Sequence, residues 1–521
     1  MTEILKSSLI WRLFAALALL YRRSPLPCLL AAVGRCWRNS AIYGFFARRL
    51  QCEPAVGHSA LQRILDRVNH KLYCFGQRLS PVLHGSLLYR AYAAVFAAGR
   101  GSKILGALFS GGMTAFLLFL ISSYAVVDYL LRDVLQFSAV ASIWDEVLIL
   151  FGFVWILFRR IHTRKPLRSA LSAVDLSISF YLVVGLLLLL YIAPVPSVNF
   201  LGFRASMQYL LLFFLVTRLI RDDRDFQMMY GTMLAIAMVI ALHGVWQFVV
   251  GVEIPTEWTD AAEGAVRTRV FSIFSNPNIL GAYMLMFAPM AIGRAYASET
   301  AAEKIFFWIC GIVMCLACLF TMSRGAWMAL AVAAVVFALL VDRKLLALML
   351  VAGVFACFLP FVRSRIGYLF TAEFAASNAK GGRGKRWSTA IGYLKANNVW
   401  LGMGYGMYGG AVAAQNPVYP WIDYMYVDNY YVKILTENGI VGLSAFLLTL
   451  CGLIWNGLRA CARTVKSRMN PLCAGMLAGL IGVLVQSFFE CIWEEPYMMA
   501  LFFAIAGMLI YAGFLSKPQK K

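Results

Sequence analysis

A segment rich in arginine, lysine and aromatic residues separates two hydrophobic stretches in the C-terminal half of the chain. It covers residues 363–430 and ends in Asp428-Asn429-Tyr430-Tyr431, directly before a new apolar stretch. A guanidinium group can bind phosphate oxygens through two parallel hydrogen bonds. A partly desolvated carboxylate has a raised pKa and can accept a proton from a hydroxyl. These residue types therefore indicate a site for a charged, polar substrate.

Two basic positions lie at the start of a predicted helix. Arg383 and Arg386 follow Gly381-Gly382, and apolar residues then recur at helical spacing from Trp387 to Leu394. A helix N-terminus attracts anions, and these arginines add to that attraction. Several glycines follow between Gly402 and Gly410, which predicts a backbone that passes close to a ligand or to another segment.

Arg324 lies in Ser323-Arg324-Gly325, between two apolar stretches that are joined by almost no loop. An arginine at the edge of the hydrocarbon either extends its side chain to water or binds an anion there. Both interpretations remain open at this point. Arg269 lies at a similar boundary, before the motif that begins at Phe274.

Asp428 is the acidic residue at the junction between residues 363–430 and the next apolar stretch. It can act as a counter-ion for the arginines or as a general base for an acceptor hydroxyl. Glu437, further along, is expected to pair with a neighbour. The aromatic residues of the segment fit either a membrane-interface belt or sugar stacking; they are Tyr405, Tyr408, Tyr419, Trp421, Tyr424 and Tyr426.

The elements that must position these residues are membrane helices. The chain of 521 residues is 61% hydrophobic and 14% charged, which is typical of a polytopic membrane protein and not of a soluble domain. Its net charge of +22 comes largely from short basic loops, so we expect a bilayer and not a nucleic acid as its partner. The sequence contains no zinc-ligand pattern, P-loop, dinucleotide fingerprint or G-x-S-x-G, so no metal or cofactor is expected.

The sequence predicts an all-α fold with about twelve transmembrane helices. The apolar stretches lie near residues 104–128, 140–158, 172–193, 203–218, 229–250, 278–294, 305–321, 325–341, 345–361, 431–456, 473–491 and 497–515. The short basic loops alternate with the other connections, so we expect both termini in the cytoplasm and residues 363–430 on the outer face. Residues 1–103 are predicted to be a basic, amphipathic cytoplasmic or interfacial region, and residues 104–515 the transmembrane domain.

Three motifs occur in a characteristic order along residues 200–515. They are Phe274-Ser275-Asn276-Pro277-Asn278, Thr321-Met322-Ser323-Arg324-Gly325, and Asp428-Asn429-Tyr430-Tyr431 followed by Glu437-Asn438-Gly439. Their order, with the long outer loop, resembles the O-antigen ligase and O-antigen polymerase superfamily of bacterial membrane glycosyltransferases.

This resemblance implies a GT-C-like helical fold that moves a glycan from a polyprenyl diphosphate donor to an acceptor hydroxyl, without nucleotide sugar or metal. By motif, Arg324 and Arg383 would hold the diphosphate, with Arg386 as the alternative to Arg383, and Asp428 would be the base. The ligases usually have a histidine at that position. The aspartate in this chain departs from that pattern and favours a polymerase, or a ligase for another surface glycan. The remaining predicted substrate contacts are Arg269, Arg386, Trp387, Tyr405, Asn429 and Tyr430.

Two other classes of function stay open on the sequence alone. A transporter of an anion or a lipid-linked sugar would carry ionisable residues near the membrane midplane, whereas the charges here collect at the edges of the apolar stretches. A non-catalytic scaffold for envelope assembly remains a further alternative, because Asp428 replaces the histidine that the resemblance predicts.

Overall fold

The computed structural model describes residues 28, 60–101, 112–162, 171–253, 268–274, 276–368, 370–373, 375–376, 381–419, 422 and 426–515. The chain divides into two compact units, residues 1–53 and 54–521, and every element discussed below belongs to the second. Within the described residues all regular elements are helices, which confirms the predicted all-α class.

Eight described helices are long and apolar enough to cross a membrane. They are α12 (Ala173–Tyr191), the continuous run of α13 (Pro196–Met207), η3 (Gln208–Leu210) and α14 (Leu211–Leu219), α15 (Asp223–Val250), α16 (Pro277–Ala297), α17 (Ala301–Phe320), α24 (Tyr430–Thr464), α25 (Met469–Gln486), and α26 (Pro496–Ile510) with η6 (Tyr511–Leu515). Two sharply bent pairs raise the number to as many as ten. One is α8 (Gly112–Ser122) with α9 (Tyr124–Tyr129) and η2 (Leu130–Val134), and the other is α19 (Lys344–Phe358) with α20 (Pro360–Tyr368).

The predicted number of twelve is not confirmed. Helices form at the two other predicted stretches, but α11 (Trp144–His162) carries charged residues near both of its ends. The other, α18 (Arg324–Leu340), has only 17 residues. Both are marginal for a hydrocarbon layer about 30 Å thick, because a straight span needs about 20 apolar residues.

Helices α16 and α25 form the centre of the bundle, and glycines allow their backbones to touch. A Cβ atom on Gly475 would lie 2.6 Å from the Pro289 carbonyl oxygen, and one on Gly479 would lie 2.2 Å from that of Met286. Small residues allow such close packing between membrane helices. The pair therefore fixes the start of α16 next to the loop that follows α25.

Helix α24 is broken near its start by Gly439, which has a φ of 63°. The freed amide groups of Ile440 and Val441 donate to the carbonyl oxygens of Val399 and Trp400. The glycine-rich loop then passes so close that a Cβ on Gly402 would lie 2.4 Å from the backbone of Glu437. The predicted close approach of these glycines is thus to another segment of the chain.

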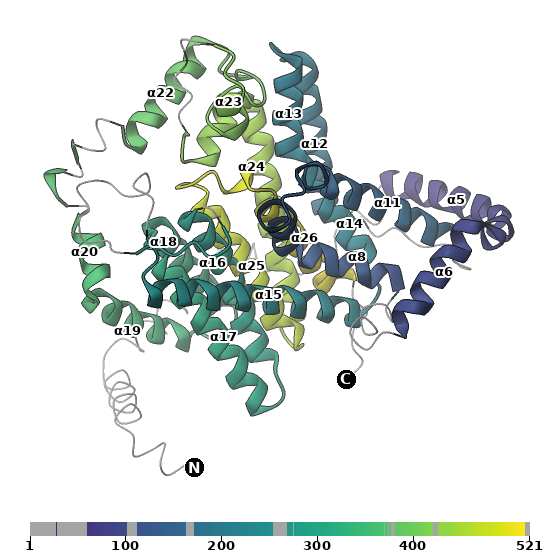
Figure 1. The fold of residues 1–521 in the computed structure, drawn as a ribbon, viewed down its shortest axis with the longest axis horizontal. Coiled ribbons are helices and arrows are strands. Elements are labelled where there is room, and N and C mark those ends of the chain that lie inside the picture. The colour runs from purple at the N-terminus through teal and green to yellow at the C-terminus, as the bar shows by residue number, and fades with distance from the viewer. Residues whose placement is uncertain are drawn as a thin grey trace. The chain divides into compact units, whose positions relative to one another are not determined.

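Two short helices precede α24 in the chain, α22 (Arg383–Ala396) and α23 (Ala411–Gln415), and Figure 1 shows both near one end of α24. The prediction of a helix after Gly382 is confirmed, and Ala390 and Leu394 on its predicted apolar face are buried. Ile391 is an exception, since it remains 37% exposed.

The N-terminal region forms helices where it is described, namely α5 (Ala60–Gly85) and α6 (Leu87–Arg100). Ile64, Val68 and Phe75 on α5 are exposed, and α5 packs against α11, where Arg160 donates to the side chain of Asn69. The interfacial role of residues 1–103 stays a prediction, and apart from Cys28 its first 59 residues lie outside the described part of the chain.

Candidate active site

Arg269 is a buried arginine that the short segment before α16 holds in place. Gln247 on α15 fixes this segment, because its Oε1 accepts hydrogen bonds from the amides of Phe271 and Ser272 at 3.0 and 2.7 Å. The Nε of Arg269 donates to the carbonyl oxygen of Thr321 at 3.1 Å. Burial lowers the pKa of Arg269 to about 10, so its guanidinium group stays charged at neutral pH.

Arg324 is the first residue of α18, and its backbone is locked by a second buried arginine. The guanidinium group of Arg365 on α20 donates twice to the carbonyl oxygen of Met322, at 2.9 and 3.1 Å. Met322 has a φ of 55°, an unusual backbone conformation that places this carbonyl toward α20. In return, Arg324 donates to the carbonyl oxygen of Arg365 at 3.5 Å and lies over the ring of Tyr368.

Arg383 is the first residue of α22 and reaches the loop after α25. Its Nη2 donates to the carbonyl oxygen of Phe489 at 2.9 Å. Its Nε is buried and has no hydrogen-bond partner among the described residues. A buried N–H of a charged group is costly to leave unpaired, so this atom marks where a further acceptor would be stabilised.

Asp428 lies beside α22 and pairs with Arg386, whose Nη1 donates to Oδ2 at 2.6 Å. Trp387 donates to the carbonyl oxygen of Val427 at 3.0 Å and so holds the backbone next to Asp428. Asp428 has a φ of 51°, another strained position. Burial raises the pKa of its carboxyl group, and Arg386 and Arg383 partly counter that rise.

Glu490 is a site residue that the sequence argument missed. Its Oε2 accepts a hydrogen bond from Asn278 at 2.6 Å, and its Oε1 accepts one from the Cys491 amide. The prediction placed it inside a membrane stretch at residues 473–491, but α25 ends at Gln486 and leaves it in a loop. The signal was present, since an acid at a hydrophobic boundary indicates function as much as an arginine does.

The structure therefore brings together Arg269, Arg324, Arg383 and Arg386, which we call the arginine cluster. The charges of Arg324 and Arg383 act on the pKa of Arg269, and those of Arg383 and Arg386 act on that of Asp428. Glu490 is coupled to Asp428 and Arg383 in the same way, so these groups share one site. All four arginines donate to main-chain carbonyl groups, which belong to Thr321, Arg365, Phe489 and, for Arg386, Gly381.

The other predicted substrate contacts have packing or capping partners. Asn429 caps α24 by accepting from the amides of Tyr431 and Val432. Tyr430 is buried and stacks on Trp493, and Tyr405 is buried against Phe203. Direct substrate contacts by these residues stay predictions. Of the aromatic cluster, Trp421 and Tyr424 lie outside the described residues.

A buried ionic network lies one to two turns into α24. Lys433 is 2.7 Å from the carboxylate of Glu437 and 3.5 Å from that of Glu494. Glu494 also accepts from the Ala411 amide, which ties the glycine-rich loop to this network. The expectation that Glu437 pairs with a neighbour is confirmed.

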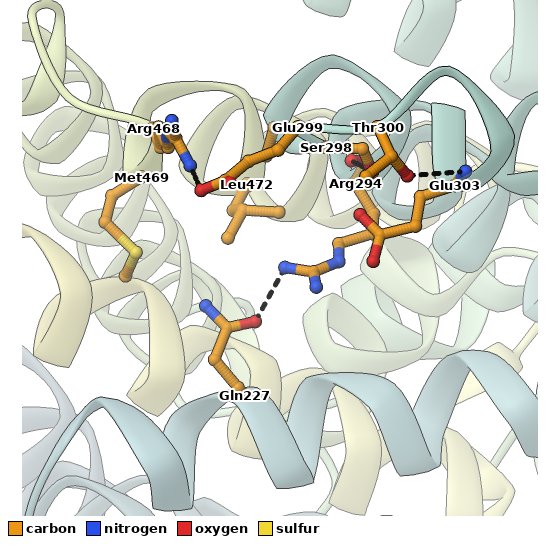
Figure 2. A pocket seen from close by; sticks show the side chains of 10 residues that line it. Gln227, Arg294, Ser298, Glu299, Thr300, Glu303, Arg468, Met469 and Leu472 are labelled. Carbon is orange, nitrogen blue, oxygen red and sulfur yellow. Dashed lines mark hydrogen bonds and ion pairs between the residues drawn. The ribbon is translucent and has the colours of Figure 1, made fainter.

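A cavity of about 590 Å³ lies at the opposite end of α16 from Asn278, and Figure 2 shows the side chains around it. Arg294 donates to Gln227 at 2.9 Å, and Arg468 pairs with Glu299. We call this the Arg294 crevice. None of the predicted site residues lines it, so it is separate from the arginine cluster.

The fold and the cluster define a polytopic helical membrane protein with a cationic site at the ends of its helices. The family model described as O-antigen ligase matches residues 309–447. This match contains Arg324, Arg383 and Asp428, and it confirms the resemblance to the O-antigen ligase superfamily. No curated protein matches the chain. The match and the apolar helices indicate an O-antigen ligase-like glycosyltransferase of polysaccharide assembly in the bacterial inner membrane.

Proposed function

We propose that this protein transfers a glycan from a polyprenyl diphosphate donor to an acceptor hydroxyl at the outer face of the membrane, with both termini in the cytoplasm. The observation that carries the proposal is the arginine cluster, in which Arg383 keeps a buried Nε without a partner among the described residues. A diphosphate offers several anionic oxygens to such guanidinium groups, and the geometry of a planar fork suits them.

In this mechanism Arg324 and Arg383 bind the diphosphate, and Arg269 adds a charge that burial does not remove. The acceptor oxygen attacks the anomeric carbon of the donor sugar, and the bond from that carbon to the diphosphate oxygen breaks. The polyprenyl diphosphate leaves with the bonding electron pair, which the arginines stabilise. We expect no metal in this step, in line with the family resemblance.

Asp428 would accept the proton of the acceptor hydroxyl. Burial raises the pKa of its carboxyl group, which makes it a better base when it is ionised. Its pair with Arg386 holds the carboxylate in place at 2.6 Å. The acceptor hydroxyl would then approach the face of the carboxylate that Arg386 leaves open.

The test is a reconstituted assay with a polyprenyl diphosphate oligosaccharide and a glycan acceptor. We expect Arg324→Ala and Arg383→Ala each to lose about 1.5–3 kcal/mol of transition-state stabilisation, roughly ten- to hundredfold in turnover. Asp428→Asn should lose about 10²- to 10⁴-fold. The exposed Lys385 on α22 provides the matched control, because Lys385→Ala should retain activity.

The products separate the remaining alternatives. A ladder of lengthened donor would identify a polymerase, and a single transferred glycan would identify a ligase. Full glycan assembly by both Arg324→Ala and Arg383→Ala would contradict the proposal. Donor binding without any product, from wild type and variants alike, would instead favour a carrier or a scaffold.

A further inference from the structure

Glu490 shares a site with the groups proposed to bind the donor, yet its carboxylate has the charge that a diphosphate also carries. It is 9% exposed, so water screens it poorly. Asn278 connects it to the cluster, since Asn278 donates to Glu490 at 2.6 Å and accepts from Arg269 at 3.4 Å. The residue before it, Phe489, supplies the carbonyl oxygen that holds Arg383.

Charged and titratable groups from several parts of the fold surround the carboxylate of Glu490. Among the described residues, the charged or titratable groups that couple to its carboxylate include Asp428, Arg383, Arg269, Tyr426 and Cys491. The two arginines favour its ionised form, whereas Asp428 opposes it. A diphosphate bound to the arginines would use the same positive charges that now stabilise this carboxylate.

We propose that Glu490 is the internal counter-ion of the donor site, and that it takes up a proton from water when the diphosphate of the donor binds. This inference rests on the proposed function and extends it. Before the donor binds, the carboxylate balances the charge of Arg269 and Arg383 and keeps Asn278 oriented. After binding, the neutral carboxyl group still accepts from Asn278 and no longer repels the phosphate oxygens.

The direction of the pH dependence follows from the burial of Glu490. Burial, and next to it the charge of Asp428, raises its pKa from 4.5 to about 7 in the free protein. A bound diphosphate adds negative charge and raises this pKa further. Below about pH 7 the proton is already present, so donor affinity is constant there. Above it, affinity falls by up to about tenfold per pH unit until the pKa of the complex is reached.

The experiment measures binding of farnesyl diphospho-N-acetylglucosamine to the full-length protein in detergent, from about pH 6 to about pH 9. This probe is a diphosphate diester, so its own charge does not change over that range. Wild type should lose affinity as the pH rises. Glu490→Gln should bind with little pH dependence and, at the upper end, about tenfold or more tightly than wild type.

Three further variants make the result specific. Glu490→Asp keeps a carboxyl group and should retain the pH dependence, which also guards against a Gln variant that does not fold. Glu495→Gln, a nearby glutamate that contacts Tyr497 and not the cluster, should behave like wild type. Asp428→Asn should lower the pH at which affinity begins to fall, because it removes a negative neighbour of Glu490.

The outcomes separate this inference from the function on which it rests. Wild-type binding without a pH dependence, or a dependence that persists in Glu490→Gln, would overturn the role of Glu490 and leave the donor site intact. A dependence that disappears in Asp428→Asn but not in Glu490→Gln would overturn it too. A wild type that does not bind the probe would remove the proposed function, and this inference with it.

Discussion

Arginines lie near both ends of α16, but the structure holds them in different ways. In the Arg294 crevice, Arg468 pairs with the carboxylate of Glu299, and Arg294 donates to the side chain of Gln227 (Figure 2). In the arginine cluster, Arg269, Arg324 and Arg383 donate to main-chain carbonyl oxygens. A carbonyl group fixes a guanidinium without neutralising it, so four arginines set against the carboxyl groups of Asp428 and Glu490 leave the cluster with net positive charge.

Besides Asp428 and Glu490, the cluster end contains two further buried carboxylates, and Lys433 engages both. Glu437 and Glu494 both lie against Lys433, which is itself buried. The two ends therefore differ in how acidic and basic side chains are distributed. At the crevice Glu299 pairs with Arg468, whereas at the cluster Lys433 binds Glu437 and Glu494 within the bundle. Of the cluster arginines, Arg386 pairs directly with Asp428, and the other three donate to carbonyl groups.

The largest effect is expected from removing that lysine. Lys433→Met would leave the carboxylates of Glu437 and Glu494 buried together without a cation, and loss of one partner of a buried pair costs about 3–5 kcal/mol. Thermal unfolding in detergent should show this loss. The double variant Lys433→Met/Glu437→Gln should recover part of it, and a single variant as stable as wild type would contradict this role of Lys433.

A smaller effect is expected when the support of Arg324 is removed. Arg365→Gln would lose the two hydrogen bonds to the Met322 carbonyl oxygen and loosen the turn that carries Arg324. We expect a rise in KM for the donor of about tenfold, equivalent to about 1.4 kcal/mol. The control is Arg363→Gln, an exposed position on the same helix. Equal donor KM values for the two variants would show that Arg365 does not position Arg324.

The smallest effect is expected at the Arg294 crevice. Arg468→Ala removes an exposed ion pair with Glu299, and such pairs contribute about 0–1 kcal/mol. Stability should therefore change little, and donor binding should not change at all. Donor affinity that falls as far as in Arg383→Ala would erase the distinction between the two ends of α16.

The sequence was sufficient to predict the all-α membrane fold and to single out residues that the structure brings together. Residue type and position at apolar boundaries singled out Arg324 and Asp428, because a charge beside hydrocarbon needs a partner or a function. Arg383 was singled out by its place at the start of a predicted helix and by the family resemblance. The helix after Gly382 could also be predicted, from its 3.6-residue periodicity and the glycines before it.

Other features depend on contacts between distant segments and could not be read from local patterns. Glu490 was not predicted as a site residue because the hydropathy pattern extended the membrane stretch beyond Gln486, where α25 in fact ends. The role of Arg365 depends on the backbone of Met322, more than forty positions away in the chain. The predicted number of spans is not confirmed because α11 carries charged residues near both ends and α18 has only 17 residues.

The use of main-chain carbonyl groups as partners for the cluster has a consequence for how this protein can evolve. A carbonyl oxygen persists whatever side chain its residue carries, so substitutions at Thr321 or Phe489 that keep the backbone path also keep the partners of Arg269 and Arg383. Under the proposed function, residues around the cluster can therefore diverge toward new acceptors while the binding of the donor is retained.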